Sequence, residues 1–191
     1  MTKVLIINGH PNPQSFNYAL ARAYANGAAA QAEVETLNLA ELEFNPNLRF
    51  GYQMRTPWEQ DLEVAVDQLK KADHWVWVFP QWWYSYPAIM KGFIDRVFLP
   101  GVTFAYQDGR PFPKKLMKGK TARMIITADS PGWYNRWFIG RPAIHQLKRG
   151  TLQFCGVKPV KVTYLAPVKG SSEAKRGKWL KMVERLGQEV K

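Results

Sequence analysis

The 191-residue sequence predicts a doubly wound α/β fold, a three-layer sandwich in which helices cover both faces of a five-stranded parallel sheet. Two observations predict it. Short aliphatic and aromatic runs, typical of strands buried on both faces, alternate with longer segments whose apolar residues recur at helical spacing. The first run leads through a polar loop into a helix, and the same order of strand, loop and helix returns near residue 80.

The chain opens with a strand, a loop and a helix. Val4–Ile7 is a short aliphatic run that stops at the turn residues Asn8 and Gly9, as a buried strand does. Ser15 is in position to cap the next helix, and Tyr18–Ala25 combines strong helix formers with apolar residues at helical spacing. We therefore expect the first helix to begin directly after a polar loop.

The next segments place a strand and a helix on either side of an irregular stretch. Glu33–Leu39 alternates like a second strand, whereas Leu42–Pro57 is broken by proline and glycine. Trp58–Ala72 carries leucine and valine on one face among charged residues, which predicts a helix. The apolar run His74–Phe79 predicts a buried central strand.

The middle of the chain continues the alternation. A loop over residues 80–87 leads into a helix expected over Ala88–Val97, whose apolar residues share one face. Lys120–Thr127 predicts the fourth strand, which ends at the polar turn Ala128–Gly132. The aromatic segment Trp133–Phe138 follows this turn.

Three further elements complete the expected fold. They are a helix over Pro142–Phe154, a last strand over Lys158–Tyr164 and a terminal helix over Ser172–Val190. The sequence has no internal repeat, and its length suits one compact core. We therefore expect residues 1–191 to form a single domain.

Composition narrows the setting in which the protein works. Cys155 is the only cysteine, which excludes a disulfide within the chain, and no Cys/His cluster indicates a metal site. The N-terminus shows no secretion signal, and no apolar run approaches the roughly 18–20 residues that cross a bilayer. We expect a cytoplasmic, soluble protein with no metal and no membrane insertion.

The formal net charge of +12 has three interpretations. Much of the excess lies in residues 110–120 and 169–181, where basic residues are scattered over turns and helical surface. A solvated basic surface is the favoured interpretation, and attraction of phosphorylated cofactors is the second. Specific nucleic-acid binding is the least favoured, so we expect no nucleic-acid partner.

Three loops are expected to meet at one edge of the sheet, because ligands of doubly wound sheets bind beyond the carboxyl ends of the strands. They span residues 8–17, 80–87 and 127–134. The first offers imidazole, hydroxyl and amide groups at a helix N-terminus, which suits a phosphate, although it carries neither common glycine-rich phosphate motif. Helix capping explains its serine and asparagine equally well, and its histidine taken alone is as often an ordinary loop hydrogen-bonder.

Four aromatic side chains crowd the second loop: Trp82, Trp83, Tyr84 and Tyr86. Exposed aromatic rings at a loop are unfavourable unless something covers them. A flat partner such as an isoalloxazine ring would stack on them. An aromatic core or a dimer contact explains them equally well from composition alone.

Several short motifs occur along the chain in a fixed order. They are Gly9–Pro11, Ser15–Asn17, Phe79–Ala88, Lys91-Gly92, Asp95–Phe98 and Phe154–Gly156. This ordered set resembles the NAD(P)H:quinone oxidoreductase family, the flavodoxin-like group that includes DT-diaphorase. The resemblance covers nearly the whole chain and implies a flavodoxin-like fold.

The resemblance implies a flavin site. In that family the first loop holds the flavin phosphate, the second lies against the isoalloxazine and the third closes over its pyrimidine side. The implied flavin contacts are His10, Ser15, Phe16 and Asn17; Pro80, Gln81, Trp82, Trp83 and Tyr84; and Thr127, Ala128 and Asp129. Tyr134 resembles the family tyrosine that lines the hydride-acceptor pocket. One flavin per subunit, FAD or FMN, and a homodimer with sites at its interface are also implied.

The sequence departs from the family pattern in two places. The third loop reads Thr127-Ala-Asp-Ser-Pro-Gly132, whereas mammalian members are rich in threonine and glycine there. No histidine matches the one that partners the family tyrosine, because Tyr134 is followed by Asn135–Phe138 and His145 comes later. A Tyr/His charge relay is therefore not expected, and His145 is interpreted as a surface or helix-packing residue.

The resemblance implies an oxidoreductase of the quinone reductase type. NAD(P)H, the co-substrate, would deliver hydride to flavin N5, and a quinone, azo or nitroaromatic acceptor would then use the same pocket in ping-pong order. Two alternatives stay open. One is a flavodoxin-type electron carrier, which the basic charge disfavours, and the other is a flavin-bearing regulatory subunit of a membrane potassium-efflux system.

Overall fold

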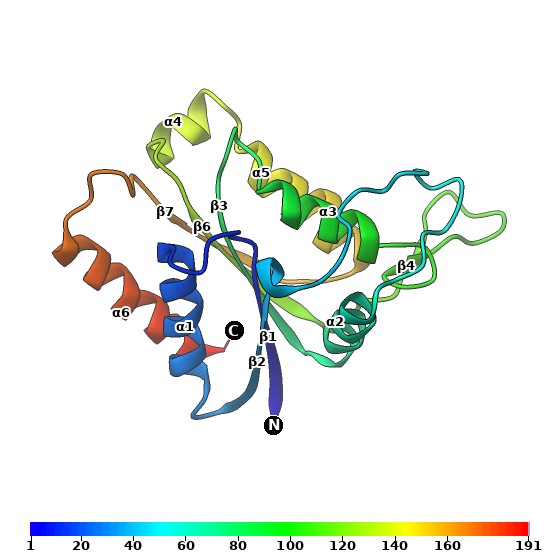
Figure 1. Ribbon diagram of the computed structural model, residues 1–191, viewed down its shortest axis with the longest axis horizontal. Helices are drawn as coiled ribbons and strands as arrows, with labels where there is room; N and C mark the ends of the chain where they lie inside the picture. Colours follow the sequence, from blue (N-terminus) through cyan, green and yellow to red (C-terminus); the bar gives the residue numbers. More distant parts are fainter. Residues whose placement is uncertain (191) are drawn as a thin grey trace.

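The computed structural model describes residues 1–190 and contains a five-stranded, all-parallel sheet (Figure 1). The strands follow the order β2-β1-β3-β6-β7 across the sheet. Their bounds are β1 (Thr2–Asn8), β2 (Ala32–Asn38), β3 (His74–Pro80), β6 (Thr121–Thr127) and β7 (Val160–Leu165). The expected doubly wound α/β fold with five parallel strands is confirmed.

Helices cover both faces of the sheet. On one side lie α1 (Phe16–Ala28) and α6 (Glu173–Glu189), and on the other lie α2 (Gln60–Lys71), α3 (Ala88–Val97) and α5 (Pro142–His145) (Figure 1). Every residue of the central strand β3 is buried. Its two tryptophans point to the α2/α3 side, and Val76 and Val78 point to the α1/α6 side. This two-sided burial explains why the strand reads as an unbroken apolar run.

The helices α1 and α6 pack backbone to backbone through two glycines. A Cβ atom on Gly27 would lie 1.9 Å from the carbonyl oxygen of Glu184, and one on Gly187 would lie 2.2 Å from that of Tyr24. Real Cβ atoms do not approach oxygen so closely, so only glycine fits at either position. The close contact fixes the α1/α6 layer against the sheet.

The structure contains elements that the sequence pattern did not predict. The segment after the fourth strand forms a short helix, α4 (Gly132–Trp137), and the expected Pro142–Phe154 helix changes after α5 into a π-helix, η2 (Gln146–Gln153). A short hairpin, β4 (Phe104–Ala105) with β5 (Lys114–Lys115), and a 3-10 turn, η1 (Leu39–Glu41), were not expected. No helix within residues 1–190 is both long and apolar enough to span a membrane.

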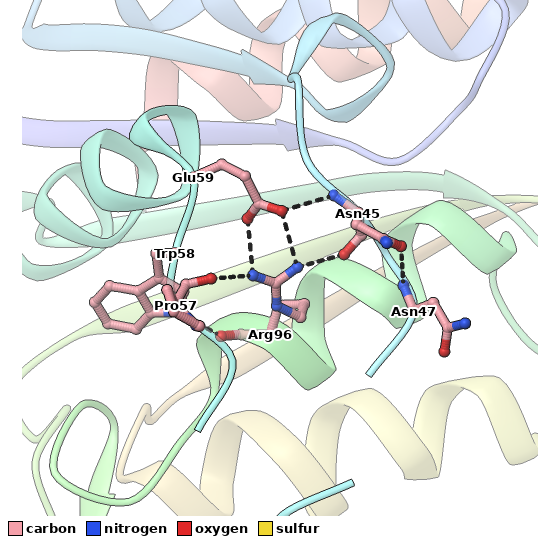
Figure 2. Close-up of polar contacts among 6 residues, drawn as sticks. All are labelled: Asn45, Asn47, Pro57, Trp58, Glu59 and Arg96. Carbon is pink, nitrogen blue, oxygen red and sulfur yellow. Dashed lines mark hydrogen bonds and ion pairs between the residues drawn. The ribbon is translucent and has the colours of Figure 1, made fainter. Parts of the chain in front are cut away.

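Arg96 fixes the irregular segment before α2 to the end of α3 (Figure 2). Its guanidinium is 1% exposed and binds Glu59 at 2.8 Å, the carbonyl of Pro57 at 2.7 Å and the carbonyl of Asn45. In return the indole N–H of Trp58 donates to the Arg96 carbonyl at 2.7 Å. Burial acts to raise the pKa of Glu59, but the hydrogen bond from Arg96 prevails and the pKa is lowered. One buried cation therefore shapes the segment that looked irregular in sequence.

Candidate functional site

Four loops enclose a hollow of about 220 Å³ at the carboxyl edge of the sheet, here called the loop hollow. The loops follow β1, β3, β6 and β7, which are neighbours in the sheet. The hollow is lined by His10, Phe16, Asn17, Pro80, Gln81, Trp82, Thr127, Ala128, Asp129 and Val168. Nine of the twelve residues expected to contact a flavin therefore line one hollow. The other three, Ser15, Trp83 and Tyr84, lie in the same loops but not in its wall.

Short side-chain bonds hold the first loop in shape. The Asn8 side-chain oxygen accepts from the amide of His10, His10 Nδ1 accepts from the amide of Asn12 at 2.9 Å, and the Asn12 side chain accepts from the amide of Gln14 at 2.9 Å. Burial lowers the pKa of His10. Because Nδ1 accepts, the neutral ring carries its proton on Nε2 and can donate from that atom. The ring lies edge-on to Trp82, with centroids 5.5 Å apart.

Unsatisfied donors gather where helix α1 begins. Ser15 occupies the N-cap position but its side chain makes no capping bond, contrary to the expected capping role. Within residues 1–190, Ser15 Oγ and Asn17 Nδ2 are buried without a hydrogen-bond partner. A buried polar atom without a partner is unfavourable by about 1–3 kcal/mol. These groups and the free amides of the first helical turn suit an anionic ligand such as a phosphate.

The aromatic loop turns through a strained two-residue hairpin. The amide of Trp82 donates to the carbonyl of Ser85 at 3.0 Å, and the amide of Ser85 donates back at 2.9 Å. Between them, Trp83 and Tyr84 have φ of 48° and 57°, in the left-handed region. Turns of this kind favour Asn-Gly, and a bulky residue there costs about 1–3 kcal/mol. The Trp83 side chain is also 98% exposed, so the loop presents a ring that its own fold does not cover.

Backbone bonds join the third loop to the loop after β7. The amide of Val168 donates to the carbonyl of Ala128 at 3.0 Å, and the amide of Lys169 donates to the Asp129 carboxylate at 2.7 Å. Val168 therefore enters the hollow's wall, although sequence reasoning did not select it. Its position directly after a strand's carboxyl end was the signal that could have found it.

A polar network joins the second and third loops beside α4. The Asn135 side-chain amide donates to the Gln81 side-chain oxygen at 3.2 Å, and the Gln81 amide donates to the Tyr164 hydroxyl at 3.5 Å. The Tyr164 hydroxyl in turn donates to the carbonyl of Ser130 at 3.1 Å. Gln81 was among the expected flavin contacts, whereas Asn135 and Tyr164 were not selected from the sequence, because one comes from α4 and the other from β7. The network fixes α4 relative to the hollow.

Tyr134 lies on α4, outside the wall of the loop hollow. Its ring stacks on Phe138 with centroids 5.4 Å apart, and 37% of the residue is exposed. A hydroxyl on an exposed ring can reach a ligand in solution. His145 is exposed at the end of α5, as expected of a surface residue. No group of three or more potential metal ligands gathers within residues 1–190.

Comparisons with known proteins show the family of the chain and its fold. A family model described as the flavodoxin-like fold matches residues 2–189. Human ribosyldihydronicotinamide dehydrogenase (quinone) is 28% identical, over 96% of this chain and 90% of its own. An uncharacterized NAD(P)H oxidoreductase of Haemophilus influenzae is 31% identical, over 82% of this chain and 79% of its own.

Solved structures show the same fold. The crystal structure of Smu.1420 from Streptococcus mutans UA159 superimposes with a TM-score of 0.86 and 32% identity, covering 99% of this chain and 100% of that one. The NAD(P)H:quinone oxidoreductase from Methanothermobacter marburgensis shares the fold at a TM-score of 0.84 and 21% identity, covering 100% of this chain and 99% of that one. Family match, relatives and architecture agree. This chain therefore belongs to the flavodoxin-like family that includes the NAD(P)H:quinone oxidoreductases.

Proposed function

We propose that this protein is a flavin-dependent NAD(P)H oxidoreductase of the quinone reductase type, with the flavin held in the loop hollow. The observation that carries the proposal is the convergence of nine of the twelve expected flavin contacts on one hollow. Relatives of 26–31% identity are named for NAD(P)H or ribosyldihydronicotinamide oxidation, most of them with a quinone as acceptor. Their names support the same reaction here.

The start of α1 is the proposed seat of the flavin phosphate. Ser15 Oγ and Asn17 Nδ2 are buried donors that lack a partner within residues 1–190. His10 Nε2 and the backbone amide of Phe16 add two more donors at the same helix end. Phosphate oxygens would accept hydrogen bonds from these buried donors. The residues at this helix end therefore suit the phosphate of a flavin.

The aromatic loop and the third loop would hold the flavin ring. Trp82 and Gln81 line the hollow together with Pro80. Trp83 and Tyr84 extend the same loop and would offer stacking surface and backbone donors. Thr127, Ala128 and Asp129 would close the opposite side. Backbone N–H groups at the ring edge would stabilise negative charge on the reduced cofactor.

The bound flavin would supply the redox chemistry, taking hydride from NAD(P)H at N5 and passing electrons to the acceptor. This chain's residues would orient the two substrates, and Tyr134 would hydrogen-bond the acceptor oxygen. The rings in contact with Tyr134 are Trp133 and Phe138, and no histidine of residues 1–190 is among them. One pocket used in turn by donor and acceptor implies ping-pong kinetics. Quinones, azo compounds and nitroaromatics are the proposed acceptors.

A cytoplasmic homodimer is the proposed form of the protein. Large aromatic side chains stand exposed outside the loop hollow, among them Trp83, Tyr106 and Phe112. Aromatic residues are enriched at protein–protein interfaces, and a partner subunit would cover these rings. The single cysteine suits a reducing compartment.

An absorbance spectrum of the purified protein tests the proposal, followed by anaerobic addition of NADH or NADPH and then of a quinone. We expect visible flavin bands that bleach with the donor and return with the quinone. Release of the flavin by denaturation then identifies FAD or FMN. A protein that takes up neither flavin would remove the enzyme assignment, and one that binds flavin but ignores both donors would favour an electron carrier or regulatory subunit.

A further inference from the structure

A second hollow, here called the basic groove, runs between α4, α5 and the edge strand β7. It measures about 1030 Å³, just above the roughly 300–1,000 Å³ of small-molecule sites. Its wall carries six basic side chains and no carboxylate. They are Arg123, Arg136, Arg141, Lys148, Arg149 and Lys161.

The segment that forms most of this groove carries basic side chains and no acidic ones. No aspartate or glutamate occurs in residues 130–172, whereas seven lysines and arginines do. Within residues 1–190, no ion pair is formed by Arg136, Lys148 or Arg149. Like charges gathered on a concave wall raise the local potential and attract anions. An anionic ligand would relieve this repulsion.

Two tryptophans give the groove an aromatic rim. Trp133 and Trp137 are 62% and 73% exposed and both line it. The guanidinium of Arg136 lies 5.0 Å from the centre of the Trp137 ring. Flat rings beside guanidinium groups bind a nucleobase by stacking and its phosphates by paired hydrogen bonds. The chemistry of the groove therefore fits a nucleotide.

The basic groove shares a wall with the loop hollow. Gln81 lines the loop hollow, while Asn135 and Tyr164 line the basic groove. Gln81 is hydrogen-bonded to both of them, at 3.2 Å and 3.5 Å. Asn135 is 1% exposed, and its side-chain oxygen has no partner within residues 1–190. A ligand with one end at the flavin could place its other end in the groove.

Arg141, in the wall of the basic groove, has a strained backbone conformation. Arg141 precedes α5 with φ of 55°, in the left-handed region that a side chain of this size rarely adopts. Its amide donates to the carbonyl of Asn135 at 3.0 Å, which ties the start of α5 to α4. Strain of this kind is kept where it positions a functional group. Here it keeps the Arg141 side chain in the groove wall.

We propose that the basic groove binds the adenosine phosphates of NAD(P)H while the nicotinamide reaches the loop hollow. The inference rests on the proposed function and adds the residues that select the donor. Arg136, Arg141 and Arg149 would bind the phosphates, and a tryptophan of the rim would stack on the adenine. The groove then favours phosphorylated donors, and NADPH over NADH because it carries one more phosphate.

The test compares three donors with the flavin-loaded protein: NADPH, NADH and ribosyldihydronicotinamide, which has no phosphate. The variant Arg136→Gln/Arg149→Gln removes two exposed groove charges. Arg22→Gln/Lys178→Gln removes two exposed charges from α1 and α6, on the other side of the sheet. We expect the groove variant to raise KM for NADPH at least about tenfold, with a smaller rise for NADH. In the groove variant, KM for ribosyldihydronicotinamide and kcat with every donor should stay within about twofold of the parent values. All kinetic constants of the control variant should stay within the same limit.

Binding of adenosine 2′,5′-bisphosphate, followed by tryptophan fluorescence, is the second readout and needs no turnover. Binding should quench the tryptophan fluorescence of the parent protein and of the control variant, but not that of the groove variant. If all three donors reduce the flavin and the groove variant changes their KM values equally, or changes none of them, the inference is overturned and the proposed function stands. Loss of duplex DNA binding in the groove variant with unchanged donor KM would overturn it in favour of nucleic acid. Failure of all three donors to reduce the flavin would remove the proposed function and the inference together.

Discussion

The side-chain oxygen of Asn17 accepts a hydrogen bond from the Thr127 hydroxyl at 3.0 Å, and both residues are buried. This contact joins the start of α1 to the end of β6, two parts of the chain that are 110 residues apart. It also sets the direction of the Asn17 amide. That amide is the buried donor without a partner within residues 1–190, so it faces away from Thr127.

Thr127→Val removes this contact while keeping the shape of the side chain. We expect the free energy of unfolding to fall by about 1–2 kcal/mol and flavin to bind about tenfold more weakly, because the Asn17 amide loses its orientation. Flavin titration and chemical denaturation measure the two effects. Thr36→Val, at an exposed position of β2, is the control. Unchanged flavin affinity in Thr127→Val would show that Asn17 does not hold the cofactor.

Trp83→Gly should stabilise the protein and weaken its function. The side chain is 98% exposed, so little packing is lost, and glycine adopts φ of 48° without strain. We expect a gain of about 1 kcal/mol in the free energy of unfolding, together with weaker flavin binding. Trp83→Ala, which removes the ring but keeps the strain, should lose flavin affinity without that gain. A glycine variant no more stable than the alanine variant would contradict this account.

His74 should make the protein sensitive to mild acid. Its ring is buried between the Tyr24 hydroxyl at 3.2 Å and the Thr121 hydroxyl at 2.6 Å, and burial lowers its pKa from 6.5 to about 4. Above pH 6.5 the ring is neutral in both states and has no effect. As the pH falls from 6.5 towards 4, the unfolded chain takes up the proton first, which lowers the free energy of unfolding by up to about 3 kcal/mol.

Urea denaturation between pH 8 and pH 4 measures this dependence. His74→Gln keeps hydrogen-bonding groups but does not titrate, so its stability should fall less over this range. His145→Gln makes the same change at an exposed position and should retain the parent's slope. Equal slopes in all three proteins would assign the acid sensitivity to other groups.

Gly187→Ala should disrupt the contact between α1 and α6. The added methyl group would lie 2.2 Å from the carbonyl oxygen of Tyr24, and the helices must separate to admit it. We expect a loss of about 2–3 kcal/mol in thermal denaturation. Gly177→Ala lies in the same helix with nothing within 4 Å of the new atom, and should stabilise the protein by about 0.5–1 kcal/mol. Similar effects at both positions would refute the close packing.

Hydrophobic spacing was enough to predict the five strands and the main helices. Two departures came from interactions that spacing does not encode. The π-helix over Gln146–Gln153 buries Leu147 and Leu152, which are five residues apart, and its i to i+5 hydrogen bonding is not predicted by hydrophobic spacing. The close packing of α1 on α6 is the second, because it depends on Gly27 and Gly187, two residues that hydrophobic spacing does not select.

The candidate site was predictable in its loops but not in its detail. Parallel strands bring their carboxyl ends to one edge, so the three loops had to meet. The left-handed conformation of Trp83 and Tyr84 runs against the local preference of aromatic residues, and only the closed hairpin shows it. The contacts of Gln81 and Asn135 likewise join segments 54 residues apart. The basic groove takes four of its six cations from residues 136–149, and the fold adds Arg123 and Lys161 from the neighbouring strands β6 and β7.

The strand order has a consequence for how the protein acquires a ligand. The loop hollow takes residues from the loops after β1, β3, β6 and β7, so it is complete only after the last strand of the chain has docked. A ligand of this hollow binds the finished fold and not a partly made one, and it stabilises that fold by mass action. The protein should therefore unfold at a higher temperature with a ligand in this hollow than without one, and resistance to proteolysis should rise with the ligand's concentration.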